Sequence, residues 1–442
     1  MNRHKCLLAI LFAAITFTSA VAQTGGTNTS YSRFGLGLMS DQSQGFNRSM
    51  GGVAQGLRSG IRVNMQNPAS YSAIDSLTFI FDVGMSLQRA FMSQGNVRQR
   101  VNNTSFDYVN MGFRLAPHLG MSIGFVPYSA IGYSFTNERK VTTDAYTQQN
   151  VTQTMTHSGD GGLNEMYAGV GWEPFKGLSI GANIGYVWGN LDHYMVQSFS
   201  ENGTANSNYN SLSNAYMTNI KTWKLDVGLQ YNAKIGEEDH LNIGFTAGIG
   251  HKIHSPANML RYMVNGDTIT RSVKNAFQLP MTYSAGVAWG HADRLTVALD
   301  YTYEGWASCV TPRIIEGQTS TDVRYEVGTG DYKNRHRINA GLEYCPSRYH
   351  RSYGKRINYR FGVFYASPNL MINGQSGPKE FGITAGLGLP IMNVINRSSQ
   401  VNFGIQWVHR SPSVSSMITE NYFRINIGLT FSESWFMKWK FQ

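Results

Sequence analysis

The sequence reads FRINIGLTF at residues 423–431, and its side chains alternate strictly in character. The odd-numbered residues are large and apolar, and the even-numbered ones are polar or small: Arg424, Asn426, Gly428 and Thr430. A period of two places the two sets on opposite faces of a β-strand. The apolar face would look into a core in a soluble sandwich and into lipid in a transmembrane barrel. The rest of the chain must distinguish these alternatives.

Rows of the same kind recur from residue 77 to the end of the chain. They predict fourteen strands, at residues 77–87, 109–115, 121–125, 166–172, 178–188, 223–231, 241–249, 277–289, 295–303, 338–344, 357–365, 381–389, 401–407 and 423–431. An even number suits a bacterial barrel, because both ends of the chain then return to the periplasm. We therefore predict an all-β protein, in which residues 76–442 form a transmembrane antiparallel β-barrel of about 14 strands.

The segments between these rows alternate in length. Short turns are expected at 117–118, 173–174, 236–237 and 290–291 and near Pro346, and longer polar loops at 138–159, 199–214, 255–272 and 307–332. Short turns are typical of the periplasmic end of a barrel and long loops of the extracellular end. Tryptophans near strand ends, such as Trp172 and Trp289, fit an aromatic girdle at the headgroup level. A soluble β-sandwich or propeller remains an alternative.

The first 75 residues differ from the rest. Residues 1–22 have the pattern of a signal peptide, with Arg3 and Lys5 before an apolar run and Ala20-Val21-Ala22 as the cleavage pattern. We therefore expect export to the outer membrane of a Gram-negative cell. No later stretch has the 18 or more apolar residues of a membrane-spanning helix. Residues 23–75 are rich in Gly, Ser, Asn and Gln and lack alternation, so they predict an irregular segment before the barrel.

The inward rows of the predicted strands carry glycines and charges. Glycines at positions such as 181 and 362 would leave room for a plug or a ligand, or would ease curvature. Opposite charges occupy inward positions of the ninth to eleventh strands, where we expect an ion-pair network that could anchor a plug: Asp300, Glu304, Arg337, Glu343 and Arg360. Such residues are more often structural than directly involved in transport.

No arrangement of residues indicates an enzyme. Ser, His and acidic residues lack the spacing of a nucleophile and its base, and no phosphate-binding Gly-Lys-Ser motif occurs. His251 and His254 lack a clear third ligand, so we expect no metal and no cofactor. Cys309 and Cys345 fall at opposite ends of neighbouring predicted strands, and no disulfide is expected between them. The formal net charge of +10 suits contact with lipopolysaccharide phosphates, while nucleic acid is implausible in this compartment.

Several stretches resemble the FadL/TodX family of outer-membrane transporters for hydrophobic compounds. Asn67-Pro68-Ala69 resembles an element of that family's N-terminal plug, and residues 160–190 resemble its mid-barrel hairpin. Residues 299–306 and 335–346 resemble a second family pairing, so the likeness covers most of the mature chain. The resemblance implies a fourteen-stranded barrel with residues 23–75 as a plug inside the lumen.

The resemblance also implies a route for the substrate. In that family the substrate leaves through the wall where the third strand is kinked, and the counterpart here is Phe125, Pro127 and Tyr128. Proline cannot donate to a strand ladder, so Pro127 marks a local break, although a bulge at the rim is an alternative. Pro280, expected on the eighth strand, raises the same question.

The implied function is passive uptake of hydrophobic molecules such as long-chain fatty acids, with lateral exit near that kink. A general porin and a surface adhesin or receptor are alternatives, and an outer-membrane lipid enzyme is a further one. The expected partners are the hydrophobic molecules, outer-membrane lipid and lipopolysaccharide, and the barrel-assembly machinery that inserts the chain. The barrel is expected to be a monomer.

Overall fold

The computed structural model of this protein describes residues 27–142, 150–201, 204–205, 211–263, 266–318, 322–391 and 399–434. The predicted signal peptide, residues 1–22, lies outside the described residues. Within the described ranges, no helix is long and apolar enough to cross a membrane.

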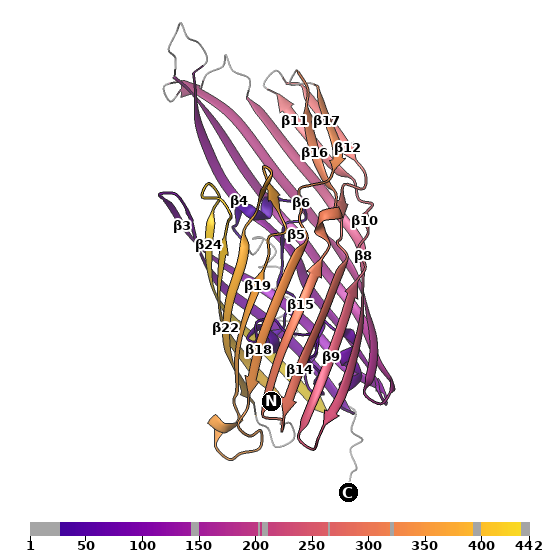
Figure 1. Ribbon diagram of the computed structural model, residues 1–442. Coiled ribbons are helices and arrows are strands. Elements are labelled where there is room, and N and C mark those ends of the chain that lie inside the picture. The colour runs from indigo at the N-terminus through magenta and orange to yellow at the C-terminus, as the bar shows by residue number, and fades with distance from the viewer. Residues whose placement is uncertain are drawn as a thin grey trace, which may run out of the picture.

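Fourteen of the described strands form one closed antiparallel barrel (Figure 1). In chain order they are β2 (Thr78–Gln94), β3 (Val97–Ala116), β4 (Leu119–Thr142), β5 (Asn150–Phe175), β6 (Leu178–Glu201), β8 (Leu212–Ile235), β9 (Asp239–Gly248), β14 (Thr282–His291), β15 (Leu295–Glu304), β18 (Arg335–Tyr344), β19 (Asn358–Ala366), β22 (Lys379–Pro390), β23 (Gln400–Ser411) and β24 (Thr419–Ser434). Pairing of β24 with β2 closes the ring. The predicted all-β barrel and its strand number are confirmed.

The alternation of side chains sets the two faces of the wall. On β24, Phe423, Ile425 and Ile427 are 51%, 40% and 40% exposed, whereas Asn426 and Thr430 are 5% and 2% exposed. The apolar residues therefore point outward and the polar residues inward, the reverse of a soluble sandwich. Exposed apolar rows of this kind require lipid around the barrel, and the soluble alternative is excluded.

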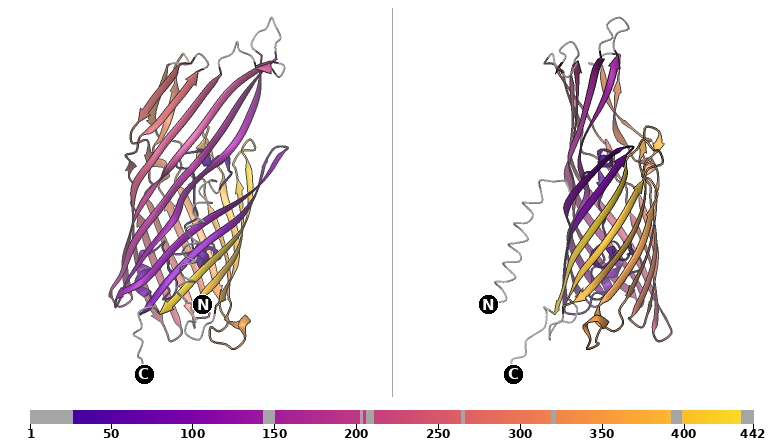
Figure 2. Two further views of the ribbon diagram at one scale, coloured as in Figure 1. Left: turned by 180° about the vertical axis from the view of Figure 1, so that it is seen from behind. Right: turned by 90° about the vertical axis from the view of Figure 1, so that its left-hand side faces the viewer.

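The barrel encloses residues 27–76, which we call the interior segment (Figure 2). It contains only short elements: η1 (Ser30–Arg33), β1 (Leu38–Met39), α2 (Gly45–Arg48) and η2 (Pro68–Ala73). Side-chain caps start two of them, because Thr29 accepts the Tyr31 N–H at 3.2 Å and Asn67 accepts the Ala69 N–H at 3.2 Å. Pro68 follows the second cap at the first helical position, where its missing N–H costs no hydrogen bond.

Glycines of the inner wall let the interior segment approach closely. A β-carbon at Gly181 would lie 2.4 Å from the carbonyl carbon of Pro68, and one at Gly362 would lie 2.1 Å from the amide nitrogen of Gly51. Both neighbours are backbone atoms, which cannot rotate away. The glycine rows are thus the surface on which the segment packs.

The upper end of the barrel, opposite the short turns, differs from the prediction. The stretches expected to be polar loops are largely strands: β4 runs to Thr142, and β11 (Ala257–Met263) with β12 (Thr268–Val273) forms a hairpin, as does β16 (Thr311–Glu316) with β17 (Val323–Gly328). Together with β5, β6 and β8 they rise as a tall wall on one side (Figure 2). Polar residues predominate on these extensions, so no apolar row marked them as strands.

The eighth strand is also shorter than predicted. It was expected from residue 277, but β14 begins at Thr282, and β13 (Phe277–Gln278) pairs instead with β10 (Lys252–Ile253). Pro280 lies between β13 and β14 and belongs to neither strand, so it does not interrupt the ladder of β14. The remaining short strands are β7 (Thr204–Ala205), β20 (Met371–Ile372) and β21 (Gln375–Ser376).

Candidate functional site

The pairing between β3 and β4 stops part-way along both strands. Its uppermost rung joins Val109 to Phe125. Above this rung β3 continues to pair with β2 as far as Val97, and β4 continues to pair with β5 as far as Thr142. Within the described residues, no rung joins β3 to β4 at these higher levels. The wall is therefore open between the upper parts of β3 and β4, which diverge in Figure 2.

A bulge lies on each side of this opening. The register of β3 with β2 skips Asp107, and the register of β4 with β5 skips Tyr128, next to Pro127. An unpaired extra residue bends a strand and increases its twist, and a proline removes one ladder donor. On β5, Gly161 and Gly162 have φ values of 117° and 143°, which glycine adopts more readily than other residues. Sequence reasoning missed this pair, although adjacent glycines within a strand indicate an unusual backbone or a close approach of another chain segment.

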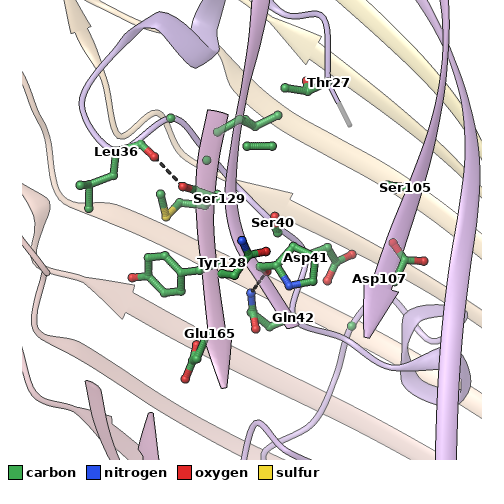
Figure 3. Close-up of a pocket in the computed structure, with 18 of the residues that line it drawn as sticks. Thr27, Leu36, Ser40, Asp41, Gln42, Ser105, Asp107, Tyr128, Ser129 and Glu165 are labelled. Atoms are coloured by element: carbon green, nitrogen blue, oxygen red, sulfur yellow. Dashed lines mark hydrogen bonds between the residues drawn. The ribbon is translucent and has the colours of Figure 1, made fainter. Parts of the chain in front are cut away.

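Part of the interior segment covers the free edge of β4. We call residues 28–42 the gate segment. Its strand β1 pairs antiparallel with β4, Leu38 opposite Ala130 and Met39 opposite Ser129. The Ser40 N–H donates to the Tyr128 carbonyl at 3.0 Å. Side chains extend the contact in both directions along β4, because Gln42 Nε2 donates to the Pro127 carbonyl at 3.0 Å and Ser129 Oγ donates to the Leu36 carbonyl at 2.6 Å (Figure 3).

The gate segment also reaches the strands on the other side of the opening. Asn28 Nδ2 donates to Asn103 Oδ1 of β3 at 2.5 Å, and Thr29 Oγ1 donates to Glu420 Oε1 of β24 at 2.5 Å. The Tyr31 hydroxyl donates to the Ile418 carbonyl at 2.6 Å. The gate segment therefore bridges the opening with side-chain contacts on the β3 side and backbone pairing on the β4 side.

A cavity of about 1330 Å³ lies behind the opening. Apolar side chains of the gate segment, such as Leu36 and Leu38, line it together with Phe106 of β3 and Phe125 of β4. The Phe106 and Phe125 rings are 5.8 Å apart between centroids, and Trp188 is 6.0 Å from Phe125. The three rings belong to three different strands and form an aromatic border at the foot of the opening.

Several charged groups that line the same cavity form ion pairs. Lys224 Nζ lies 2.7 Å from Asp226 and 3.2 Å from Glu165, and it sits 5.9 Å from the Tyr128 ring centroid. Across the cavity, Arg48 of α2 contacts Asp107, the bulged residue of β3, at 2.5 Å. These pairs neutralise part of the charge that surrounds the cavity.

Asp41, at the end of the gate segment, depends on its basic neighbours. Burial alone would raise the pKa of its carboxyl group, but the guanidinium groups of Arg48 and Arg337 outweigh that effect. Together with a hydrogen bond from Ser43, they hold the pKa of Asp41 well below its usual range. Asp41 is therefore ionised at neutral pH and fixes the gate segment to α2 electrostatically.

The residues predicted from the sequence separate into two places. Phe125, Pro127 and Tyr128 all line the cavity. Asn67, Pro68 and Ala69 do not line it, and they pack at the start of η2 against the lower wall. There Asn67 Nδ2 donates to the Gln55 carbonyl at 2.9 Å and holds two turns of the interior segment together.

The inward charges of β15, β18 and β19 have several kinds of partner. Glu343 contacts Arg360 at 2.5 Å and Arg62 of the interior segment at 3.0 Å, and Glu304 contacts Arg335 at 3.6 Å. Two of the five residues make no ion pair among the described residues. Asp300 instead accepts backbone N–H groups of the interior segment, including that of Gln55 at 2.9 Å. Arg337 donates to Asn339 Oδ1 at 2.9 Å, and its guanidinium carbon lies 4.7 Å from the Phe364 ring centroid.

The histidines and cysteines considered as ligands or disulfide partners have structural surroundings. His251 stacks on Trp223 with 4.1 Å between ring centroids, and His254 is hydrogen-bonded to Asn275 at 2.9 Å. Cys309 and Cys345 are buried and free. Among the described residues, no cluster of three or more His, Cys, Asp or Glu could hold a metal ion.

Solved structures with a similar architecture include two toluene transporters and a FadL homologue. The Ralstonia pickettii toluene transporter TbuX matches with a TM-score of 0.57 at 14% identity, over 91% of this chain and 98% of that chain. The Pseudomonas putida toluene transporter TodX matches with a TM-score of 0.57 at 14% identity, over 91% and 100%. A Pseudomonas aeruginosa FadL homologue matches with a TM-score of 0.56 at 10% identity, over 89% and 98%. The chain thus has the fold of FadL-like barrels, as the sequence resemblance predicted.

No curated protein matches the sequence. A family model described as BamG matches residues 3–442, nearly the whole chain. The chain therefore belongs to the BamG family.

Proposed function

We propose that this protein is an outer-membrane channel through which hydrophobic molecules pass laterally between β3 and β4. The observation that carries the proposal is the end of the β3–β4 ladder at the Val109–Phe125 rung, with a cavity of about 1330 Å³ directly behind it. An interrupted ladder in a barrel wall is costly, because free strand edges expose backbone polar groups to lipid, and here, among the described residues, only the short strand β1 covers the β4 edge. The structural relatives named as toluene transporters give independent support.

Binding would be driven by burial of the ligand's apolar surface. Each buried CH₂ group contributes about 0.8 kcal/mol, so a tail of several carbons is held by several kcal/mol. The cavity exceeds the range of roughly 300–1,000 Å³ that is typical for small-molecule sites, and a long acyl chain fits such a volume. Long-chain fatty acids are the substrates that we propose first. Passage from one apolar environment to another needs no energy source.

The gate segment would have to leave β4 before a ligand passes. Its contacts with β4 include the Met39–Ser129 pairing and the hydrogen bond from Gln42 to the Pro127 carbonyl. A hydrogen bond contributes about 0.5–1.5 kcal/mol net, so a handful of them is comparable to the burial of several CH₂ groups. Ligand binding can therefore supply the free energy that opens the gate, provided that the ligand binds the open state better.

The interior segment favours this reading over an open porin. It would act as a plug, because backbone atoms of Pro68 and Gly51 pack directly on the glycines of the barrel wall. We propose further that residues 1–22 are removed as a signal peptide, that the barrel-assembly machinery inserts the chain, and that the barrel works as a monomer.

A disulfide across the gate tests the proposal. Because Ser40 N–H bonds to the Tyr128 carbonyl, the next pair, Met39 and Ser129, is a non-hydrogen-bonded pair with closely spaced β-carbons. Met39→Cys with Ser129→Cys, in a background in which Cys309 and Cys345 are replaced by Ala, would lock the gate segment to β4. Uptake of radiolabelled oleate and of toluene into proteoliposomes is expected to fall to the level of empty vesicles after oxidation and to return after reduction.

The matched control places the same bond where no gate is proposed. Thr136 and Thr156 are partners on β4 and β5, on the edge of β4 that faces away from the gate segment, and their side-chain oxygens are 3.1 Å apart. Neither residue lines the cavity, so Thr136→Cys with Thr156→Cys should leave uptake unchanged in both redox states. Equal uptake by the locked and unlocked gate variants, with the disulfide verified by mass spectrometry, would overturn lateral passage at this edge.

A further inference from the structure

Three arginines gather on the outside of the β2–β3 hairpin. Ala90 and Met92 of β2 are buried at 0% and 8% exposure and point inward, so Arg89 and Phe91 point outward. Arg100 of β3 pairs with Phe91 across the ladder and shares its face. Arg98 pairs with Ser93, on the same face, two residues nearer the tip of the hairpin. All three arginines are exposed.

An aromatic ring organises this cluster. The guanidinium carbons of Arg89 and Arg100 each lie 5.7 Å from the Phe91 ring centroid. Phe91 in turn meets Phe423 edge-on at 6.0 Å on the neighbouring strand. Two cations are therefore held at one ring, at a distance typical of cation–π contacts. We call Arg89, Arg98 and Arg100 the outer arginine cluster.

No carboxylate compensates the outer arginine cluster among the described residues. None of its members makes an ion pair, and the outward positions beside it on β24 are Thr419 and Asn421. The next outward positions add His409 of β23, hydrogen-bonded to Asn421 at 2.8 Å, and the exposed Lys379 of β22. The three arginines carry like charge on two adjacent strands and repel one another, and an anionic partner would relieve that repulsion.

The outer arginine cluster lies directly above the apolar belt. On β2 the residues below it are Leu87 and Met85, which are 47% and 43% exposed and point outward. On β24 the belt continues with Ile425 and Ile427, each 40% exposed. A lipid whose acyl chains lie on this belt would bring its headgroup to the level of the arginines. Long arginine side chains at such a boundary keep their stems on apolar surface and their charge in the headgroup layer.

We propose that the outer arginine cluster binds the phosphate groups of a phosphorylated lipid in the outer leaflet. The planar guanidinium group donates two parallel hydrogen bonds to phosphate, which makes arginine better suited than lysine to this recognition. The acyl chains would lie along Met85 and Leu87, on the outside of the barrel. This site rests on the proposed outer-membrane location but does not depend on transport. It lies on the hairpin whose β3 edge borders the opening in the wall.

The test measures lipid binding by the full-length barrel and requires no transport. Diphosphoryl lipid A in detergent micelles is titrated onto the purified protein, and bound lipid is counted by native mass spectrometry. Replacement of the cluster by R89Q, R98Q and R100Q together is expected to weaken binding by about tenfold to one hundredfold, since each basic residue near a charged surface contributes. The matched control is R348Q, R351Q and K355Q, which removes three exposed charges from the loop after β18 at the opposite end.

Each outcome of the lipid-binding experiment either supports or overturns the proposed phosphate-binding site. Loss of binding in the cluster variant alone, with a smaller loss in R89K/R98K/R100K, supports a phosphate-binding surface. Equal loss in the control variant would show a net-charge effect and overturn the site. Equal affinity for lipid A without phosphates, or displacement by inorganic phosphate at the same concentration, would overturn the phosphorylated-lipid assignment. If the triple variant does not fold, R89Q and R100Q singly should each weaken binding severalfold, and unchanged affinity in both would overturn the site. Oleate uptake without lipid A, measured on the same variants, reports separately on the proposed channel.

Discussion

The carboxylate of Asp300, on barrel strand β15, accepts the backbone N–H of Gln55 in the interior segment at 2.9 Å. The same oxygen accepts the N–H of Ala54 at 2.5 Å. The sequence predicts an ion pair for Asp300, but its carboxylate instead accepts backbone N–H groups. Buried backbone N–H groups need acceptors of this kind. Asp300 thus joins the barrel wall to the interior segment, next to Gln230 of β8, which donates to the Gln55 carbonyl at 2.8 Å.

Asp300→Ala should loosen the middle of the interior segment. It leaves two buried donors without an acceptor, at a cost of about 1–3 kcal/mol for each group. Asp300→Asn keeps one acceptor oxygen and should cost less. Hydrogen exchange of the peptides that cover residues 50–60 measures the effect, with the peptides of β15 as internal control. Unchanged exchange in Asp300→Ala would show that the contact does not hold the segment.

Gly181→Ala should displace η2 from the wall. The added β-carbon would lie 2.4 Å from the Pro68 carbonyl carbon, a backbone atom, and overpacking of this kind costs about 1–3 kcal/mol. Gly354→Ala is the matched control, because a β-carbon there meets nothing within 4 Å. Thermal unfolding in detergent, followed by circular dichroism, should show a lower Tm for Gly181→Ala only. Equal Tm values for the two variants would contradict the packing argument.

The contribution of Asp41 should depend on pH. Because its folded-state pKa is lowered, the stability that it adds is present above the unfolded-state pKa of about 4 and is lost as the pH falls below that value. Wild type should therefore exceed Asp41→Asn in Tm at pH 6, and the difference should shrink below about pH 4. Comparing the two proteins cancels the titration of other carboxylates. A difference that stays constant from pH 6 to pH 2.5 would argue against the Asp41–Arg48 interaction.

Pro127→Ala should reduce uptake without unfolding the barrel. Alanine supplies the N–H that proline lacks, so β4 can continue a regular ladder past Phe125 and narrow the opening. Oleate uptake by cells, with surface expression confirmed, is expected to fall severalfold. Pro174→Ala, at the lower end of β5, should leave uptake unchanged. Normal uptake by a folded Pro127→Ala barrel would count against lateral exit at this kink.

The sequence predicts a strand where one face of that strand meets lipid, because such a face needs a row of apolar residues. All fourteen barrel strands are predictable, because each has an apolar row toward lipid, as in Phe423 to Phe431. The upward extensions are not, because stretches such as Thr152–Thr156 of β5 have polar residues on both faces. The break in the ladder at Pro127 can be predicted from the sequence, because proline lacks the N–H group that a ladder needs. The pairing of Leu38 and Met39 with β4 is not, since it involves two residues that meet across about ninety positions of sequence.

The seam between β2 and β24 runs from the Thr78–Ser434 rung to the Ser93–Thr419 rung, and it joins the first barrel strand to the last. The interior segment precedes β2 in the chain, yet it lies within the ring that this seam closes. It is translated before the barrel strands, and its backbone lies against glycines of the inner wall. Closure of the β2–β24 seam around a segment that already lies in the lumen would avoid threading that segment into a finished barrel. We therefore expect the last strand to dock after the interior segment has entered the lumen.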